Sequence, residues 1–350
     1  MARLGIALAA VSVLVAAAQV FGASAARPPQ NFDIFSIGLD GSGKRQLTSD
    51  PVEEVFPAVS PDGRKIAYER GNFRFSDSEI CIMNADGSGQ RRLVDTPGTT
   101  QMRPTWSPNG RWIAFTSVDP STCRPGERNC ATWSVWIVRP DGTGLRQIHG
   151  GGGVGERFPR WSPNGRRLAF EADIAMGDSN SIFVVDLSGD GRRVTRGIVS
   201  HPSWSPDGRW IVFHHYNLRN DDQAAYIVRV DGRARRRLTA ATVSDSGPEW
   251  SPAGQRIAVP RFVRGANGFG VYLVPVRGGR PKRVGIAQSF VWSPRGKRLA
   301  LTKEGGIFVV NADGRGLRRV TSEPGGWVGW SPGGGRLVYS APGAVPPPPG

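Results

Sequence analysis

The sequence predicts an all-β fold: a seven-bladed β-propeller of four-stranded antiparallel blades, closed by pairing its N-terminal and C-terminal hairpins. Two short motifs alternate along the chain, seven copies of each, and both have the character of hairpins. The 47 Gly and 28 Pro also suit a protein of many short strands and tight turns. No stretch shows a sustained amphipathic helical period. A ring of six or eight blades is the alternative.

The first motif is a Trp-Ser-Pro-x-Gly turn followed by an apolar strand, as in WSPNGRWIAF from Trp106. Pro presets the turn and Gly accepts a positive φ, whereas the Trp and Ile-Ala-Phe flanks favour strands. Gaps between copies run from 38 to 55 residues, which is the period of a four-stranded propeller blade. The serines of the seven copies are Ser60, Ser107, Ser162, Ser205, Ser251, Ser293 and Ser331.

The second motif is an apolar run, an Asp-Gly-type turn and a basic stretch, as in IFVVNADGRGLRRVT from Ile307. It predicts a second hairpin, so that each blade has strands A to D from the axis outward. Residues 32–48 form such a hairpin with no Ser-Pro-x-Gly hairpin before it, and residues 327–340 form a Ser-Pro-x-Gly hairpin with none of the second kind after it. We therefore expect these two segments to build one shared blade, which closes the ring and removes free sheet edges.

These motifs resemble the TolB-type, WD-like propeller repeat, and the resemblance covers residues 32–340. Departures from its pattern are Val59 in place of Trp, and Arg295 and Gly333 in place of Asp. The family resemblance implies a small N-terminal α/β domain before a six-bladed propeller. This chain has seven copies of each motif, beginning near residue 32, so we expect the propeller without that domain.

The two ends of the chain have a different composition. Arg3, an apolar run over 4–21 and the small-residue site Ala23-Ser24-Ala25 predict a signal peptide over 1–25. An uncleaved membrane anchor is the alternative, because the run has nearly the length of a span. Residues 32–340 are then a single propeller domain, and residues 341–350 are a Pro-rich tail.

The formal charge of +16 indicates an anionic partner. An exported chain is separated from intracellular nucleic acid, so we expect a protein or an anionic envelope polymer as the partner. We further expect a monomer that is at most peripheral to the membrane. The predicted location is secreted, or in the periplasm or cell envelope.

Function is expected on the face where strands B and C, and successive blades, are connected, because loops of varied sequence gather there. Polar residues that enter strand A are predicted to line the channel mouth and to bind a small polar ligand or a peptide terminus. The alternative is that they are solvated or form salt bridges between blades. The predicted ligand-binding residues are Glu54, Arg103, Arg157, Arg160, His201 and Glu249.

No catalytic residue, metal or cofactor is predicted. A Gly-x-Ser-x-Gly elbow is absent, and only four His occur. A weaker hypothesis places a metal on one loop with His214, His215, Asp221 and Asp222. Cys123 and Cys130 are a possible disulfide within one loop, and Cys81 is expected to be a buried apolar residue. The expected function is an exported binding scaffold; the alternative is a propeller-type hydrolase or lyase acting on a polysaccharide or peptide.

Overall fold

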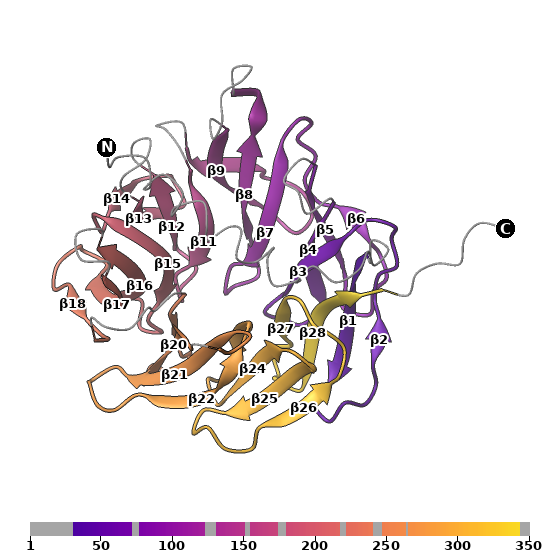
Figure 1. The fold of residues 1–350 in the computed structure, drawn as a ribbon. Helices are drawn as coiled ribbons and strands as arrows, with labels where there is room; N and C mark the ends of the chain where they lie inside the picture. Colours follow the sequence, from indigo (N-terminus) through magenta and orange to yellow (C-terminus); the bar gives the residue numbers. More distant parts are fainter. Residues whose placement is uncertain are drawn as a thin grey trace, which may run out of the picture. The chain divides into compact units, whose positions relative to one another are not determined.

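The computed structural model describes residues 31–71, 77–122, 131–150, 155–173, 180–217, 222–240, 247–263 and 265–343. Within them the chain forms seven four-stranded antiparallel sheets arranged as the blades of a propeller (Figure 1). The predicted fold class and blade number are confirmed. The predicted signal peptide, the Cys123–Cys130 pair and residues 344–350 of the predicted tail lie outside the described residues.

Blade 1 is built from both ends of the described chain. Strand β1 (Phe32–Gly38) pairs with β28 (Arg336–Pro342) over seven residue pairs, from Phe32 opposite Pro342 to Gly38 opposite Arg336. With β27 (Val328–Trp330) inside and β2 (Arg45–Gln46) outside, they complete the sheet. The expected ring closure is therefore confirmed, and β28 runs two residues beyond the predicted domain end at residue 340.

The other six blades are continuous in sequence, each with strand A innermost and strand D outermost. Blade 2 has β3 (Glu54–Val59), β4 (Lys65–Arg70), β5 (Glu79–Asn84) and β6 (Arg91–Arg92). Blade 3 has β7 (Thr100–Trp106), β8 (Ile113–Asp119), β9 (Thr132–Val138) and β10 (Arg146–His149), with a short 3-10 helix η1 (Pro120–Thr122) after β8. Blade 4 has β11 (Arg157–Trp161), β12 (Arg167–Asp173), β13 (Asn180–Asp186) and β14 (Gly191–Arg193).

Blades 5 to 7 repeat this order and complete the ring. Blade 5 has β15 (Ile198–Trp204), β16 (Trp210–Asn217), β17 (Asp222–Arg229) and β18 (Arg236–Arg237). Blade 6 has β19 (Glu249–Trp250), β20 (Arg256–Phe262), β21 (Phe269–Pro275) and β22 (Lys282–Ala287). Blade 7 has β23 (Ser289–Trp292), β24 (Arg298–Lys303), β25 (Gly306–Asn311) and β26 (Arg318–Thr321). No helix among the described residues has the length and apolar character needed to cross a membrane.

Seven apolar clusters fill the seven interfaces between neighbouring blades. One contains Phe170 of blade 4 beside Val135 and Ile137 of blade 3, and another joins Ile34 of blade 1 to Tyr68 of blade 2. A blade has two apolar faces, so each must pack against a neighbour on either side. Cys81 is buried in the cluster between blades 1 and 2, as expected, where burial raises the pKa of its thiol to about 12.

The repeated Trp at the end of strand A also joins blades. The indole N–H of Trp106 donates to the carbonyl of Ala58 in the preceding blade at 2.8 Å, and that of Trp204 donates to the carbonyl of Arg160 at 3.0 Å. Trp161, Trp292 and Trp330 make the equivalent bond, whereas Trp250 donates to Gly254 of its own blade. Val59, which replaces Trp in blade 2, packs against the cluster between blades 1 and 2.

The residues of the Ser-Pro-x-Gly motif each have a structural role in the turn. The Ser60 hydroxyl donates to Asp62 at 2.6 Å and accepts the N–H of Lys65 at 2.9 Å, while Gly63 adopts a φ of 73°. Gly accepts this left-handed conformation without the clash of a Cβ. These turns and the turns between strands C and D share one side of the ring, which we call the turn face; strands A begin at the opposite side, the loop face. The serines are therefore structural.

Candidate functional site

Strand A bends at one position in five successive blades. Four residues before the motif serine, a residue with left-handed φ precedes a proline, and the pairing with strand B skips there in blades 2 to 5. The residues are Phe56 (φ 51°), Arg103 (φ 54°), Phe158 (φ 58°), His201 (φ 55°) and Gly247 (φ 54°). Such a conformation costs on the order of 1–3 kcal/mol for a residue other than Gly, and it persists only where the surroundings impose it.

Blades 7 and 1 have a regular strand A instead. The equivalent residues are Ser289 and Trp327, which are followed by Phe290 and Val328 in place of proline. Pairing between β23 and β24 runs without a skip from Ser289 to Trp292. The bend therefore accompanies the proline, and it re-aims the side chain of the residue before it.

The side chains at this position form a chain of ring contacts across five blades, which we call the mouth belt: Trp327, Phe56, Arg103, Phe158 and His201. The rings of Trp327 and Phe56 have centroids 4.0 Å apart. The Arg103 guanidinium lies 4.3 Å from the Phe56 ring and 4.6 Å from the Phe158 ring, so it is held between two aromatic faces. The Phe158 and His201 rings stack with centroids 6.2 Å apart.

Side chains of strand B in the preceding blade bind the backbone N–H groups of three belt residues. Glu69 of β4 accepts the N–H of Arg103 at 3.1 Å, and Glu171 of β12 accepts the N–H of His201 at 2.6 Å. Thr116 of β8 accepts the N–H of Phe158 at 3.3 Å in the same way. These bonds satisfy N–H groups that the bend removes from the regular ladder.

Burial sets the protonation of these groups. It raises the pKa of Glu69 to about 7 and raises that of Glu171, while it lowers the pKa of Arg103 to about 10. Burial, followed by the nearby guanidiniums of Arg160, Arg103 and Arg157, lowers the pKa of His201 to about 4. His201 is therefore a neutral ring at physiological pH, with three arginines close by.

Five of the six predicted residues are brought together at this mouth. Arg103 and His201 belong to the belt, and Arg160 reaches from blade 4 toward Glu249 of blade 6, with 3.9 Å between nitrogen and oxygen. Arg157 pairs with Asp173 at 2.5 Å and lies over the Trp133 ring at 5.4 Å. A salt bridge between blades, which the sequence left as the alternative, is formed by Arg160 and Glu249, whereas Arg157 pairs with Asp173 within blade 4.

Glu54 does not face the mouth. Its side chain is fully buried, and neither carboxylate oxygen makes a hydrogen bond within the usual geometric limits. Burial raises its pKa to about 7, which the negative charges of Asp33 and Asp50 reinforce and the nearby Thr48 hydroxyl partly offsets. Glu54 is thus a buried acid between blades 1 and 2 and makes no contact available to a ligand.

The described residues of the suggested metal loop lie in two strands and not in one loop. His214 and His215 lie in β16 and Asp222 in β17, and Asp222 pairs with Arg237 at 2.7 Å. His214 approaches the Ser200 hydroxyl at 3.3 Å. Asp221 lies outside the described residues. Among the residues that the structure describes, no group of three His, Cys, Asp or Glu could hold a metal ion.

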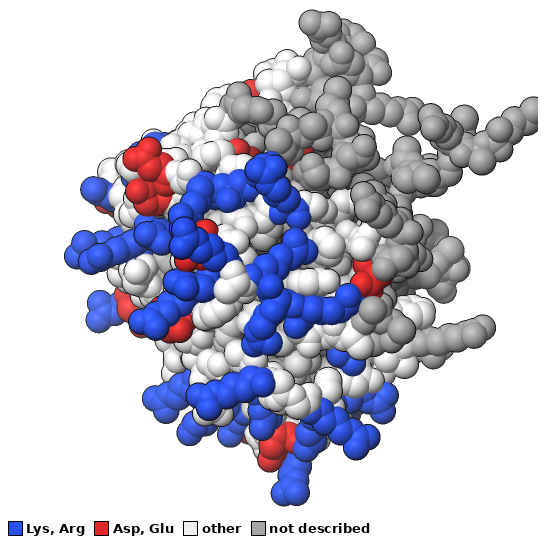
Figure 2. Space-filling model, turned by 90° about the vertical axis from the view of Figure 1, so that its left-hand side faces the viewer, with Lys and Arg blue, Asp and Glu red and all other residues white. Residues whose placement is uncertain are grey.

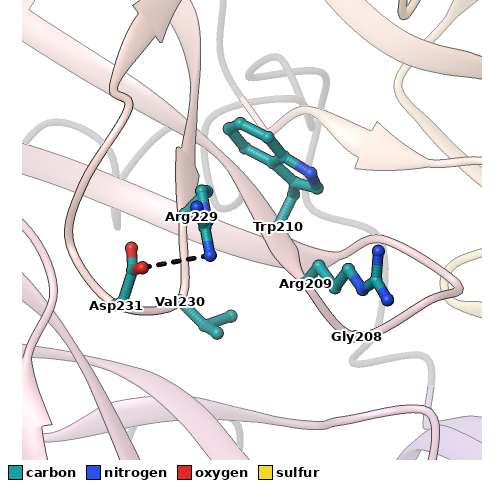
Figure 3. A pocket seen from close by; sticks show the side chains of 6 residues that line it. All are labelled: Gly208, Arg209, Trp210, Arg229, Val230 and Asp231. Atoms are coloured by element: carbon teal, nitrogen blue, oxygen red, sulfur yellow. Dashed lines mark ion pairs between the residues drawn. The ribbon is translucent and has the colours of Figure 1, made fainter.

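Sequence reasoning missed the aromatic half of the belt and the two glutamates behind it. A signal for the belt was present, because a proline stands three residues before the motif serine in blades 2 to 6. It also missed an open groove of about 540 Å³ on the turn face of blade 5, lined by Gly208, Arg209, Trp210, Arg229, Val230 and Asp231 (Figure 3).

Comparisons with known proteins agree with this architecture. The model of the TolB beta propeller domain family matches residues 124–342, which is more than half of the chain. The chain belongs to the TolB β-propeller domain family. A TolB homolog of Chlorobium luteolum is 27% identical over 155 residues, or 44% of this chain and 31% of that protein. The chain spans less than half the length of the curated relatives it matches.

Solved structures share the fold. TolB from Acinetobacter baumannii superposes with a TM-score of 0.57 at 19% identity, covering 81% of this chain and 65% of that one. Oligogalacturonate lyase from Vibrio parahaemolyticus superposes with a TM-score of 0.66 at 14% identity, covering 89% and 96%. Identities this low support the common fold alone, and one fold can host unrelated functions.

Proposed function

We propose that this chain is an exported binding protein that holds a partner protein against the loop face and channel mouth of its propeller. The mouth belt carries the proposal. Five blades contribute one side chain each to a row of rings around a guanidinium. Three of these residues, Arg103, Phe158 and His201, have a strained left-handed backbone, and the N–H of each donates a hydrogen bond to a side chain of the preceding blade. Strain of this kind gathers at functional sites.

The composition of the belt suits a protein partner. Aromatic and Arg side chains are enriched in the buried cores of protein interfaces, and Trp and Arg are among the residues that contribute most of the binding energy there. The guanidinium of Arg103 already stacks between two rings, so little side-chain entropy remains to be lost when a partner binds.

An exposed aromatic pair lies on the same face. Phe262 ends β20 and Phe269 begins β21, and the two are opposite each other in the strand pairing. Phe262 is 64% exposed and Phe269 is 36% exposed, which is unusual for large apolar side chains. A partner docked on the loop face of blade 6 would remove both rings from water.

The proposed export places this surface in the cell envelope, with the protein at most peripheral to the membrane. It rests on the apolar run and small-residue site within residues 1–25. N-terminal sequencing of protein recovered from cell fractions tests it. A mature chain beginning at residue 26 in the envelope or medium is expected, and a chain retained intact in the cytosol would contradict export.

Site-specific photo-crosslinking tests the binding face. A photoreactive amino acid replaces Phe262 on the loop face, and a matched protein carries it in place of Arg64 on the turn face. We expect one discrete envelope protein to be captured from position 262 and not from position 64. Arg103→Ala, combined with the probe at position 262, should reduce that capture. Equal capture from both positions, or none from position 262, would refute the proposal.

The enzyme alternative is tested with the same protein. Purified chain is incubated with uronate polysaccharides and with peptides that have blocked ends, and products are measured by mass spectrometry. Turnover that Arg103→Ala or His201→Ala removes would replace the binding proposal with a catalytic one.

A further inference from the structure

The outer rim of blades 4, 5 and 6 carries an unusual density of positive charge. The segments from the turn between strands C and D through strand D, residues 187–196, 230–239 and 276–285, hold eleven Lys and Arg and two Asp. The equivalent segments of blades 1 and 2, residues 39–48 and 85–94, hold four Lys and Arg and two Asp, and that of blade 7, residues 312–321, holds three Arg and one Asp, as the blade 4 segment does. Figure 2 shows Lys and Arg gathered on the side of the molecule where β14 and β18 lie in Figure 1. We call these three segments the basic rim.

Acidic neighbours offset the basic side chains in blades 1 and 2. Lys44 pairs with Glu323, and Arg92 pairs with both Glu79 and Asp95. Among the described residues, Arg237 is the one Lys or Arg of the basic rim with an ion pair, which it forms with Asp222, and Asp231 of the rim pairs with Arg229 just outside it. With eleven Lys and Arg against two Asp in these segments, the positive charges repel one another, and an anionic partner would relieve that repulsion.

Hydrogen bonds hold several of these arginines in place. Arg192 of blade 4 donates to the carbonyl of Val230 in blade 5 at 2.9 Å, and Arg236 of blade 5 donates to the carbonyl of Val276 in blade 6 at 2.5 Å. Each guanidinium keeps further N–H groups beyond the one it uses. The rim therefore presents a continuous set of donors across two blade interfaces, positioned before any partner arrives.

The groove of blade 5 adjoins this rim and contains the half-buried indole of Trp210, which also packs against the apolar cluster between blades 5 and 6. In blade 3 the equivalent Trp112 lies beneath two guanidiniums, Arg139 at 5.1 Å and Arg146 at 5.7 Å. In blade 5 the counterpart of Arg139 is Arg229, which pairs with Asp231 at 3.3 Å (Figure 3). No guanidinium of the described residues stacks on Trp210, and its side chain lines the groove.

We propose that the basic rim and the Trp210 groove bind an acidic polysaccharide. Guanidinium groups match carboxylates with two parallel hydrogen bonds, and an indole face accepts the apolar face of a sugar ring. A flexible chain can follow the outer edges of three successive blades, which a flat bilayer cannot do. The choice of a sugar polymer over a nucleic acid rests on the proposed export of the chain. This surface is separate from the mouth belt and from the partner protein proposed for it.

The test compares two triple variants with the same change in charge. Arg196→Glu, Arg233→Glu and Arg283→Glu place one reversal on each blade of the rim. Arg45→Glu, Arg64→Glu and Arg315→Glu place three exposed reversals on blades 1, 2 and 7. Alginate, a polymer of uronic acids, is the probe, and its affinity is measured at two salt concentrations. We expect the rim variant to lose roughly tenfold or more in affinity and the control variant less than about threefold.

A second pair of variants examines the groove. Trp210→Leu should weaken alginate binding several-fold, whereas Trp112→Leu, at the covered position of blade 3, should leave it unchanged. Thermal unfolding of all variants shows which of them remain folded. If Trp210→Leu does not fold, the triple variants still decide whether the rim is the site.

Other polyanions separate the sources of negative charge. Neutral dextran should not bind, and inorganic polyphosphate, single-stranded DNA and phosphatidylglycerol vesicles should bind more weakly than alginate. Equal losses in the two triple variants, no alginate binding, or tighter binding to DNA or vesicles would overturn the proposal. None of these results affects the crosslinking test of the loop face, so the two proposals fail independently.

Discussion

The Ser-Pro-x-Gly turns and the mouth belt lie a few residues apart in the same strands, yet they use the repeat in opposite ways. The turn serines of blades 2 to 5, such as Ser60 and Ser162, accept the backbone N–H five residues on and donate to the Asp or Asn two residues on. Four residues upstream, the side chain changes from blade to blade, through Phe, Arg, Phe, His, Gly, Ser and Trp. Uniform positions build the ring, and the variable position gives it one specific surface.

The pKa values of carboxyl groups also differ between the turns and the mouth. In the turn, the hydrogen bond from the Ser60 hydroxyl and the N–H of Arg64 lower the pKa of Asp62. Near the mouth, burial raises the pKa of Glu69, Glu171 and Glu249. The turn is therefore built on ionised groups in water, whereas the inner strands hold acids that resist ionisation. The following predictions test this contrast, from the largest effect to the smallest.

Replacing a core phenylalanine should lower stability, whereas replacing a belt phenylalanine should mainly affect binding. Phe170 is fully buried between blades 3 and 4, so Phe170→Ala should cost about 3–5 kcal/mol. Phe158→Ala, in the belt of the same blade, should cost much less and should abolish partner capture. Urea unfolding gives the free energies. Similar losses of stability in both variants would remove the distinction between core and belt.

Glu54 should make stability fall as pH rises. Its pKa is near 7 in the folded chain against 4.5 when exposed, so the folded state binds the proton more tightly. The favourable contribution is complete below about pH 4.5 and is lost as pH rises through 7. Glu54→Gln should therefore unfold like the parent protein at pH 4 and be more stable by up to about 3 kcal/mol at pH 8. A difference that does not depend on pH would contradict the buried acid.

Glycine substitution should have opposite effects in bent and regular inner strands. His201 has a φ of 55°, so His201→Gly relieves strain and should keep or raise stability by up to about 1 kcal/mol. Ser289 occupies the same repeat position in a regular strand, where Ser289→Gly should cost about 0.5–1 kcal/mol. Denaturation midpoints measure both. Destabilisation of equal size in the two variants would show that the bend stores no strain.

A turn serine should affect stability alone. Ser162→Ala removes the acceptor for the N–H of Arg167 and should cost about 1 kcal/mol. Capture of the partner from position 262 should stay at the parent level, since the turn face takes no part in it. Loss of capture in a folded Ser162→Ala protein would show that the turn face takes part in binding the partner.

The sequence predicted the ring because each blade repeats local chemistry. Tight turns, alternating motifs and unmatched end hairpins are all visible in single segments, and β1 paired with β28 as expected. Glu54 shows where such reasoning stops. It enters strand A as the other candidates do, but its exposure depends on blade 1 packing against it, which no local pattern reveals.

Two further features depended on partners distant in sequence. Trp112 and Trp210 occupy the same repeat position, but Arg139 lies over Trp112, whereas its counterpart in blade 5, Arg229, pairs with Asp231. The acceptors for the backbone N–H groups of Arg103 and His201 were also hidden from sequence reasoning, because Glu69 and Glu171 come from the preceding blade in each case. Proline three residues before the motif serine was visible, and it marks the bend in any similar repeat.

The most direct measurement is the affinity of the crosslinked partner for Arg103→Ala compared with Arg111→Ala. Arg103 lies between Phe56 and Phe158 at the mouth, and Arg111 follows the Ser-Pro-x-Gly turn of the same blade. Removing a central interface arginine should weaken binding by about 2 kcal/mol or more, which is roughly thirtyfold, and Arg111→Ala should change it less than about twofold. Equal affinities for the two folded variants would contradict a binding site at the channel mouth.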